Sequence, residues 1–315
     1  MTHDELDEAG QDQSAAAVFA AHRERLWGIA YGILGSPDDA DDLVQEAYLR
    51  WHRTDRTAVR HAEAWLVTTT TRLGIDRLRA RQVERRHYVG PWLPTPVVDP
   101  SPRPDRGAEI ASELSVAFLV LMERLAPEER AAFLLRDVFD VEYRDIARVL
   151  DRGEAACRQV VRRARTRVRA DAPRFRPSTA EIEAMARQFS AAVAADDYTG
   201  LLALLSPDAS FLTDGGGKAW AARNVVRSAD RVARCVLGVA RKRGAGGDME
   251  ERLARVNGEP GIVTYQDGKA IAATMFSLQD GRIRSIYRVL NPDKLSAVPA
   301  LHVLDAQYRT EVSGS

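Results

Sequence analysis

Arginine is the residue type with the clearest chemical meaning in this sequence, and it gathers in two segments. In residues 152–176 arginine recurs every few positions, and only Glu154 and Asp171 are acidic. A second basic segment covers residues 72–86. The chain as a whole has a formal net charge of zero, so these segments are local patches of positive charge. Guanidinium groups bind phosphate and guanine through paired hydrogen bonds, which indicates nucleic acid as a partner.

The first basic segment lies inside a two-helix pattern at residues 142–169. Ile146, Val149 and Leu150 give the first helix an apolar edge at helical spacing. Gly153 stands in the turn and is an acceptable N-cap for the second helix, whose apolar stripe is Ala156, Val160, Val161, Ala164 and Val168. A short helix, a turn and a second helix with a basic outer face predict a helix-turn-helix. The alternative is a solvated basic helix packed in a bundle.

Length and composition allow two or three domains with ordinary hydrophobic cores. The 315 residues are 45% hydrophobic. Cys157 and Cys235 are the only cysteines, so neither a disulfide framework nor a metal-binding spacing is expected. No apolar run approaches the length of a membrane span, and the acidic start does not resemble a signal peptide, so we expect a cytoplasmic protein.

The helix signals in the first half of the chain position both basic segments. Ser36 and Pro37 are typical of the start of a helix, which then carries Leu43 and Val44 on its apolar side. A long helix is expected at 61–86, although Thr68–Thr71 are poor helix formers. Prolines between residues 88 and 106 predict an extended linker, and Trp92 inside it suggests docking, since linkers that only span distance are polar.

The second half changes character after two prolines at 173 and 177. Two helices are expected at 179–195 and 198–205. Strand-like runs follow at 209–213, 249–256, 261–266, 269–278 and 282–290. The Asp-Gly pairs at 267–268 and 280–281 predict hairpins between the later strands. Helices followed by a meander of strands predict an α+β domain.

Several of these motifs, taken in order, resemble the extracytoplasmic-function sigma factors. DDADDLVQE at 38–46, AWL at 64–66 and LGIDRLR at 73–79 look like region 2 of that family, and LRDV at 135–138 with the helix-turn-helix looks like region 4. WLPTP at 92–96, DGGGK at 214–218 and NPDK at 291–294 resemble the branch with a SnoaL-like C-terminal domain. This chain departs from the family at Thr68–Thr71, at Gly153, where serine is common, and at Thr95, where the branch tends to have glutamate.

The resemblance implies a multidomain fold of two all-α sigma domains and an α+β SnoaL-like cone. The expected divisions are a disordered tail at 1–13, region 2 at 14–86, a proline-rich linker at 87–112, region 4 at 113–171, a hinge at 172–178, the SnoaL-like domain at 179–295 and a tail at 296–315.

The resemblance also implies a set of partners, namely core RNA polymerase through its β′ clamp and β subunits, and promoter DNA in both double- and single-stranded form. Region 4 would read the −35 element, with base-reading candidates Arg158, Gln159 and Arg162 and phosphate candidates Arg163, Arg165 and Arg167. Region 2 would hold the −10 element, with candidates His61, Arg72, Arg77 and Arg79. The clamp would meet an acidic rim at Asp41, Asp42, Leu43, Val44, Gln45, Glu46 and Ala47. Trp65 and Cys157 are expected in the core.

For the C-terminal domain we expect regulation in cis. The expected contact residues are Trp92, Leu93, Pro94, Pro96, Asp214, Gly215, Gly216, Gly217, Lys218, Asn291, Pro292, Asp293 and Lys294. Asp214 is the one candidate acid for catalysis and has no histidine partner between 179 and 291, so we expect no enzyme, cofactor or metal. Two alternatives stay open: an enzyme or small-molecule-binding protein with a helical DNA-binding module, and a transcription factor that works without polymerase.

Overall fold

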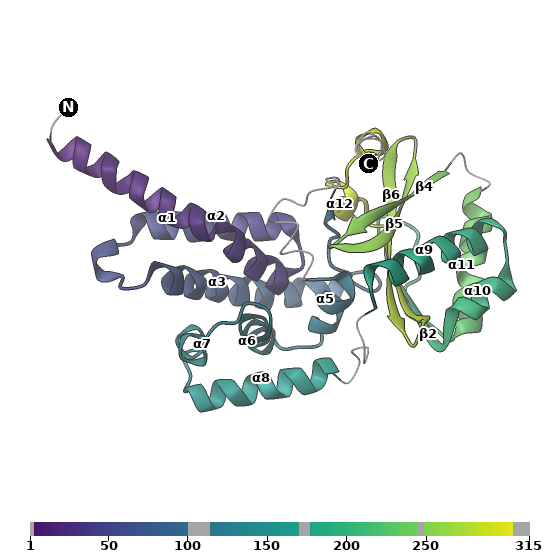
Figure 1. Cartoon of the computed structure of the whole chain (residues 1–315), viewed down its shortest axis with the longest axis horizontal. Helices are drawn as coiled ribbons and strands as arrows, with labels where there is room; N and C mark the ends of the chain where they lie inside the picture. Colours follow the sequence, from purple (N-terminus) through teal and green to yellow (C-terminus); the bar gives the residue numbers. More distant parts are fainter. Residues whose placement is uncertain (1–2, 100–113, 170–176, 245–248, 305–315) are drawn as a thin grey trace. The chain divides into compact units, whose positions relative to one another are not determined.

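The computed structural model describes residues 3–99, 114–169, 177–244 and 249–304 (Figure 1). They belong to two compact units. One unit comprises Met1–Glu84 with Leu121–Ala170, and the other comprises Arg85–Val120 with Asp171–Ser315. The linker therefore belongs to the same unit as the C-terminal domain. The predicted hinge at 172–178 lies mostly outside the described residues.

The first unit begins with three helices that form its core. They are α1 (His3–Leu34), α2 (Pro37–Arg53) and α3 (Ala62–Glu84), with a short 3-10 helix at Arg56–Ala58 before α3. A second 3-10 helix, at Arg85–His87, begins the other unit. Ser36 caps α2 as predicted, because its side chain accepts a hydrogen bond from the Asp39 N–H and Pro37 occupies the first turn. Helix α1 begins at His3, inside the segment 1–13 that the sequence predicted as a tail, and that segment contains good helix formers such as glutamate, glutamine and alanine.

Four further helices follow the linker. They are α5 (Val116–Met122), α6 (Pro127–Asp137), α7 (Tyr143–Leu150) and α8 (Glu154–Arg169). Asp151 ends α7 in the left-handed region at φ 51°, and the Gly153 carbonyl accepts the Cys157 N–H at 3.0 Å, so the turn and the N-cap of α8 lie where the sequence placed them. The predicted apolar stripe of α8 is wrong at one position: Ala156 is exposed, and Cys157 is the buried residue in its place. The prediction of Cys157 as a core residue is confirmed.

The second unit is built on a seven-stranded sheet with the order β1-β4-β5-β6-β7-β2-β3. Its strands are β1 (Val98–Asp99), β2 (Leu205–Asp214), β3 (Val226–Arg227), β4 (Met249–Val256), β5 (Glu259–Gln266), β6 (Lys269–Gln279) and β7 (Arg282–Val289). Only the β2–β7 pairing is parallel. The two predicted Asp-Gly hairpins are confirmed, since Asp267 and Asp280 and the glycines after them have positive φ.

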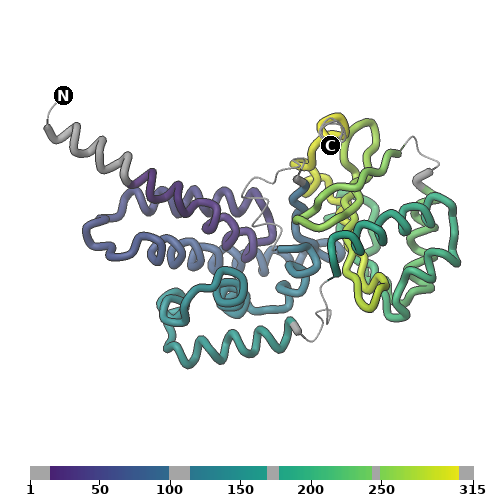
Figure 2. Tube along the Cα trace, viewed as in Figure 1, coloured from purple at the N-terminus to yellow at the C-terminus, as the bar shows by residue number. Residues whose placement is uncertain are grey.

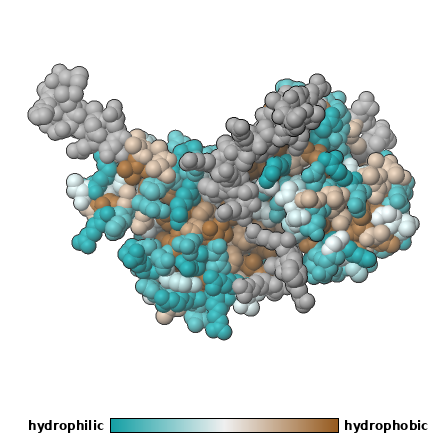
Figure 3. Space-filling view, in the orientation of Figure 1, coloured by the Kyte–Doolittle hydropathy of each residue, from teal (hydrophilic) through white to brown (hydrophobic). Residues whose placement is uncertain are grey.

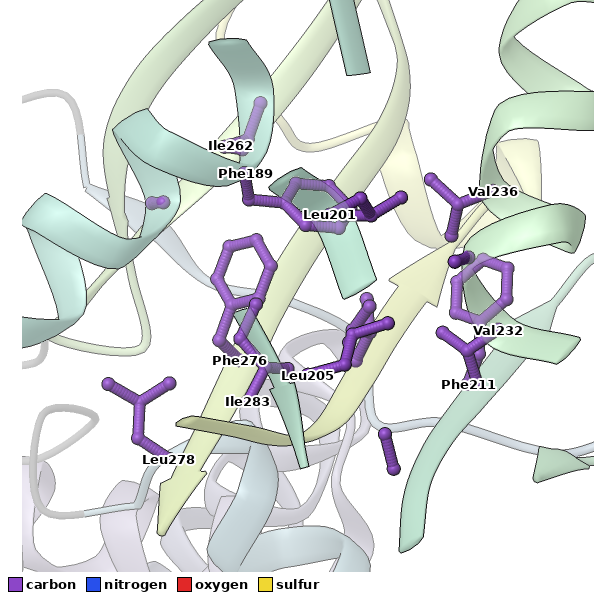
Figure 4. Packing of buried hydrophobic residues seen from close by; sticks show 14 of the residues in the cluster. Phe189, Leu201, Leu205, Phe211, Val232, Val236, Ile262, Phe276, Leu278 and Ile283 are labelled. Atoms are coloured by element: carbon purple, nitrogen blue, oxygen red, sulfur yellow. The ribbon is translucent and has the colours of Figure 1, made fainter. Parts of the chain in front are cut away.

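Three helices cover one face of the sheet: α9 (Thr179–Ala194), α10 (Tyr198–Leu204) and α11 (Ala229–Gly244). Between them and the sheet lies a packed apolar cluster (Figure 4). Phe189 meets Phe276 edge-on, with ring centroids 5.1 Å apart. Helix α11 was not predicted, although Val232, Ala233, Val236 and Leu237 form its buried stripe.

The opposite face of the sheet is covered by segments from both ends of this unit. Leu93, Val98 and Val116 come from the linker side, and Leu295, Val298, Leu301 and Leu304 come from the segment that begins with α12 (Pro292–Leu295). The chain trace in Figure 2 shows the route of both segments. The linker at 87–112 and the tail at 296–315 were predicted as separate pieces. Their described residues are instead part of the core, because they bury the apolar side chains that this sheet face presents.

Candidate functional site

Helix α8 presents the residues predicted to read bases on its exposed face. Arg158, Gln159 and Arg162 are all exposed. Arg158 pairs with Glu154 at 2.9 Å, and its guanidinium lies 5.1 Å from the centre of the Tyr143 ring. The part of the surface formed by α7 and α8 is mostly hydrophilic (Figure 3). This face suits a polar, negatively charged partner.

The three arginines predicted to contact phosphate are held by carboxylates of α6. Arg165 binds Asp137 through two nitrogens, with Nε–Oδ2 at 2.8 Å, and this bond raises the pKa of Arg165. Arg167 pairs with Glu129, and Arg163 lies 3.9 Å from the same carboxylate. A phosphate must therefore compete with an existing ion pair at Arg165 and Arg167.

The basic residues of α3 are also engaged within the first unit. Arg72 donates to the carbonyls of Val149 at 3.0 Å and Arg148 at 2.5 Å, at the C-terminal end of α7. Arg77 donates to the Asp39 carbonyl at 3.4 Å. Arg79 bonds Asp76 and Glu128, and the Glu128 contact is the main cause that raises the pKa of Arg79.

A groove of about 770 Å³ lies beside α3 and the loop before it. Its lining residues are Arg50, Thr54, Asp55, Ala58, Val59, Arg60, His61, Ala64, Trp65, Thr68, Thr69, Arg72 and Arg148. Thr68 and Thr69 line this groove, whereas Thr70 and Thr71 are fully buried. The four threonines are therefore divided between the groove and the interior of the unit. Trp65 is half-buried: it packs against Trp51 with ring centroids 5.4 Å apart and also lines the groove, so its assignment to the core is only partly correct.

Helix α2 requires a correction to the predicted polymerase-binding surface. Leu43, Val44 and Ala47 are buried in the first unit, because they form the apolar side of α2 against its neighbours. Their side chains cannot contact a partner while the unit is folded. The accessible face carries Asp38, Asp41, Asp42, Gln45 and Leu49, with Glu46 half-buried. Leu49 is 45% exposed and was missed, because an exposed leucine looks like a core residue in sequence.

In the second unit, Asp214 at the end of β2 joins the linker to the C-terminal segment. Its carboxylate has no solvent exposure and accepts three hydrogen bonds, from the Tyr88 hydroxyl at 2.5 Å, the Leu93 N–H at 2.8 Å and the Lys294 ammonium at 2.7 Å. Lys294 also donates to the Leu93 carbonyl. Both backbone polar groups of Leu93 are thus bound by one buried ion pair. We call Tyr88, Trp92, Leu93, Asp214 and Lys294 the linker clasp.

The aromatic residues of the clasp surround the lysine. The Lys294 nitrogen lies 4.1 Å from the centre of the Trp92 ring and 5.3 Å from that of Tyr88. The Arg85 guanidinium lies 3.4 Å from the Trp92 ring, so two cations contact this indole. Burial and the neighbouring Asp214 raise the pKa of Tyr88. Tyr88 and Arg85 were missed, since they precede the WLPTP motif.

The glycine turn allows the clasp to close. Gly216 has φ 58°, and a Cβ there would lie 2.3 Å from the Asn291 amide nitrogen, so a larger residue does not fit. Asn291 donates to the Tyr88 hydroxyl at 3.1 Å and caps α12 through the Asp293 N–H. Lys218 and Asp293 form an exposed ion pair at 2.5 Å. The structure therefore brings together the three motifs WLPTP, DGGGK and NPDK.

Comparisons with known proteins address the family of this chain. The family profile described as Sigma-70 region 2 matches residues 18–84, and that described as Sigma-70, region 4 matches residues 115–168. The chain is 39% identical over 293 residues to "ECF RNA polymerase sigma factor SigJ" of Mycobacterium tuberculosis, covering 89% of this chain and 93% of the relative. The chain belongs to the ECF RNA polymerase sigma factor family. A second relative, "Probable ECF RNA polymerase sigma factor SigI" of the same species, is 27% identical and matches 92% of this chain and 98% of its own length.

The solved structures include one that extends over both units of this sigma factor. The crystal structure of M. tuberculosis SigJ matches 90% of this chain and 99% of its own, with a TM-score of 0.74 and 36% identity. The expected multidomain class, two helical sigma regions and an α+β C-terminal domain, is confirmed. Region 2 contains the second half of α1 together with α2 and α3, and region 4 contains α5 to α8.

Within the described residues of this sigma factor, no helix is long and apolar enough to cross a membrane. Nor does the described part of the chain bring together three or more histidine, cysteine, aspartate or glutamate side chains that could hold a metal ion.

Proposed function

We propose that this sigma factor reads the −35 element with Arg158, Gln159 and Arg162 on the exposed face of α8. Arginine pairs with guanine and glutamine with adenine in the major groove, and each such pair discriminates by about 1–3 kcal/mol. The groove beside α3 takes an unpaired base of the −10 element, with His61 and Arg72 at its wall. Arg77 and Arg79 contribute positive charge along the same helix.

We further propose that α2 binds the β′ clamp of core RNA polymerase through its exposed face. Asp41, Asp42 and Gln45 offer acidic and polar groups, and Leu49 adds an apolar contact beside them. Burial is the main cause that raises the pKa of Asp41, with smaller contributions from the adjacent Asp38 and Asp42 and an opposing effect of Arg23. A basic, partly apolar clamp surface complements this face of α2.

The C-terminal domain acts in cis through the linker clasp, and one observation carries this proposal. The buried Asp214–Lys294 pair binds the N–H and the carbonyl of Leu93, in the segment that connects region 2 to region 4. A linker held at Leu93 has fewer conformations than a free one. The clasp therefore limits the separations of regions 2 and 4 that the protein samples, and hence the promoter spacings that it uses.

The same domain is not an enzyme in this proposal. The space between its sheet and its helices is filled by apolar side chains such as Phe189, Leu201 and Phe276 (Figure 4). Asp214, the acid that the sequence offered for catalysis, is bonded to three donors and has no exposure. A surface groove of about 600 Å³ beside α9 and β4 is the place at which a small-molecule ligand would be sought.

The experiment is transcription in vitro with core polymerase and promoters that differ only in the spacing between the −10 and −35 elements. We expect Lys294→Ala to broaden the spacing optimum, because it releases the Leu93 carbonyl and leaves Asp214, which accepts the Leu93 N–H, without its counter-ion. Lys218→Ala is the matched control, since it removes a lysine from an exposed pair. Core binding, measured by pull-down, should be equal in all three proteins. An unchanged spacing optimum for Lys294→Ala, at normal folding, would refute control through the clasp.

A further inference from the structure

The C-terminal domain contains a third basic segment, comparable with the two in the sigma regions. Between Gly215 and Arg243 the only acidic residue is Asp230. The segment has eight basic residues: Lys218, Arg223, Arg227, Arg231, Arg234, Arg241, Lys242 and Arg243. Since the whole chain has no net charge, this concentration is a property of the segment and not of the overall composition.

Part of this positive charge is not neutralised by ion pairs. Lys218 pairs with Asp293, Arg234 with Asp230 and Arg241 with Asp196. Among the described residues, no ion pair engages the other basic side chains of the segment whose positions are described. They are Arg223, Arg227, Arg231 and Lys242, and all four are exposed. These groups are available to an anionic partner.

An exposed tryptophan lies within this basic surface. Trp220 is 67% exposed, the highest value among the large hydrophobic side chains that the structure describes as exposed. The Lys242 nitrogen lies 5.8 Å from the centre of its ring. A flat aromatic ring beside a cation is the combination with which proteins bind single-stranded nucleic acid, because the ring stacks on a base while the cation meets the phosphate.

The geometry of α11 extends the surface away from Trp220. Arg231 and Lys242 are eleven residues apart, about three turns, so they lie on the same face of the helix about 16 Å from each other. Gly238 lies between them on that face, and a Cβ there would meet nothing within 4 Å. The middle of the face is therefore open. At the rise of about 3.4 Å per nucleotide along the axis of a duplex, 16 Å corresponds to about five nucleotides, and to fewer in an extended strand.

We propose that Trp220, Arg231 and Lys242 form a binding site for single-stranded DNA on the C-terminal domain, with an unpaired base stacked on Trp220. Bases in a duplex are already stacked on both faces, so the ring discriminates in favour of the single strand. The site is distinct from α3 and α8 and adds a third DNA contact to this sigma factor. An acidic protein surface would satisfy the charges but would leave the ring without a stacking partner.

The first test measures binding of the full-length protein to a fluorescent oligo(dT) of about 12 nucleotides by anisotropy. We expect Trp220→Ala to weaken binding about tenfold and Trp220→Phe to retain most of the affinity. Lys242→Ala should reduce the slope of log affinity against log salt concentration by about one, because one phosphate contact is lost. Binding to a duplex of the same length should be unchanged in Trp220→Ala. Arg187→Ala, which removes an exposed arginine of α9, is the matched control.

The second test separates this site from the sigma regions, which also bind DNA. Photocrosslinking of oligo(dT) containing 5-iododeoxyuridine, followed by peptide mapping, should yield an adduct on the peptide that carries Trp220. The proposal is overturned if adducts are confined to peptides of α3 and α8, or if Trp220→Ala binds the single strand as the wild type does. The proposal is also overturned if Trp220→Ala lowers the affinity for the single strand and for the duplex equally, or if it weakens only the binding of core polymerase.

Discussion

Asp214 is the residue on which the linker clasp depends, and its charge can be tested separately from its shape. Asp214→Asn leaves the Lys294 ammonium buried without its counter-ion, and breaking such a pair costs about 3–5 kcal/mol. Asp293→Asn is the matched control. It breaks an exposed pair with Lys218, which should cost less than about 1 kcal/mol. Amide hydrogen exchange of β7, which pairs with β2, reports the stability of this unit. Equal protection in the two variants would contradict the assignment.

Tyr88 makes the stability of the clasp fall as the pH rises through the alkaline range. Its pKa is raised in the folded protein, so the neutral hydroxyl stabilises the fold fully below the ordinary tyrosine pKa of about 10, and this contribution is lost as the pH rises above it. Tyr88→Phe lacks the hydroxyl and should be less stable by about 1–3 kcal/mol near neutral pH. Urea unfolding should show the gap between the two proteins shrinking above about pH 10. A gap that stays constant from neutral pH upward would count against the role of the hydroxyl.

Single residues of the site were predictable to different degrees. The glycines and Asn291 could be assigned to a turn and a cap from their types, because those types have local backbone preferences. The expected contact residues already included Leu93, Asp214 and Lys294, but the hydrogen bonds between them could not be predicted, since Leu93 and Lys294 lie 121 and 80 residues from Asp214 in sequence. Leu93 in particular contributes its backbone, which every residue has, so no side-chain signal marks it.

At the scale of elements, α2 distinguishes a folding face from a binding face. Leu43→Arg places a cation at a site without solvent exposure and should unfold region 2, at a cost above the 2–5 kcal/mol typical of truncating a buried leucine. Asp42→Arg, one residue earlier and exposed, should leave the melting temperature unchanged and weaken core polymerase binding about tenfold or more. Circular dichroism and pull-down separate the two effects. Normal core binding by Asp42→Arg would move the clamp contact to another element.

The elements themselves were largely predictable where one residue pattern dominated. The Asp-Gly turns fixed two hairpins, and β4 begins and ends where its sequence run does. Helix α11 was missed because its apolar stripe is interrupted by arginines and Gly238, which lower the apparent periodicity. The exposure of Asp41 and Asp42 on α2 was predicted correctly. The apolar residues of the same helix were predicted to face both the core and a partner, but the structure buries them.

At the scale of the molecule, the linker and the C-terminal domain form one folding unit. A chain restricted to residues 177–315 lacks Leu93, Val98 and Val116, so part of one sheet face becomes exposed to water. We expect this fragment to aggregate or to bind a hydrophobic dye, and co-expression with residues 85–120 to reverse the effect. Size-exclusion chromatography provides the measurement. A fragment that is monomeric and binds no dye would show that the linker is dispensable for the fold.

The division into units was the least predictable feature. Prolines and changes in composition marked the linker as a boundary, and those signals report local stiffness and polarity. They do not report which distant surface a segment covers. The residues that anchor it, among them Leu93 and Val98, are too few to form a periodic pattern, and their partners lie on strands more than a hundred residues later.

The long separation within the clasp has a consequence for synthesis on the ribosome. Leu93 and Lys294 are 201 residues apart, so at a translation rate of about 5–20 residues per second the lysine is added about 10–40 seconds after the leucine. Regions 2 and 4 are complete before that moment, because their matched segments end at residues 84 and 168. Every newly made molecule therefore passes through an interval in which both sigma regions exist and the linker between them is still free.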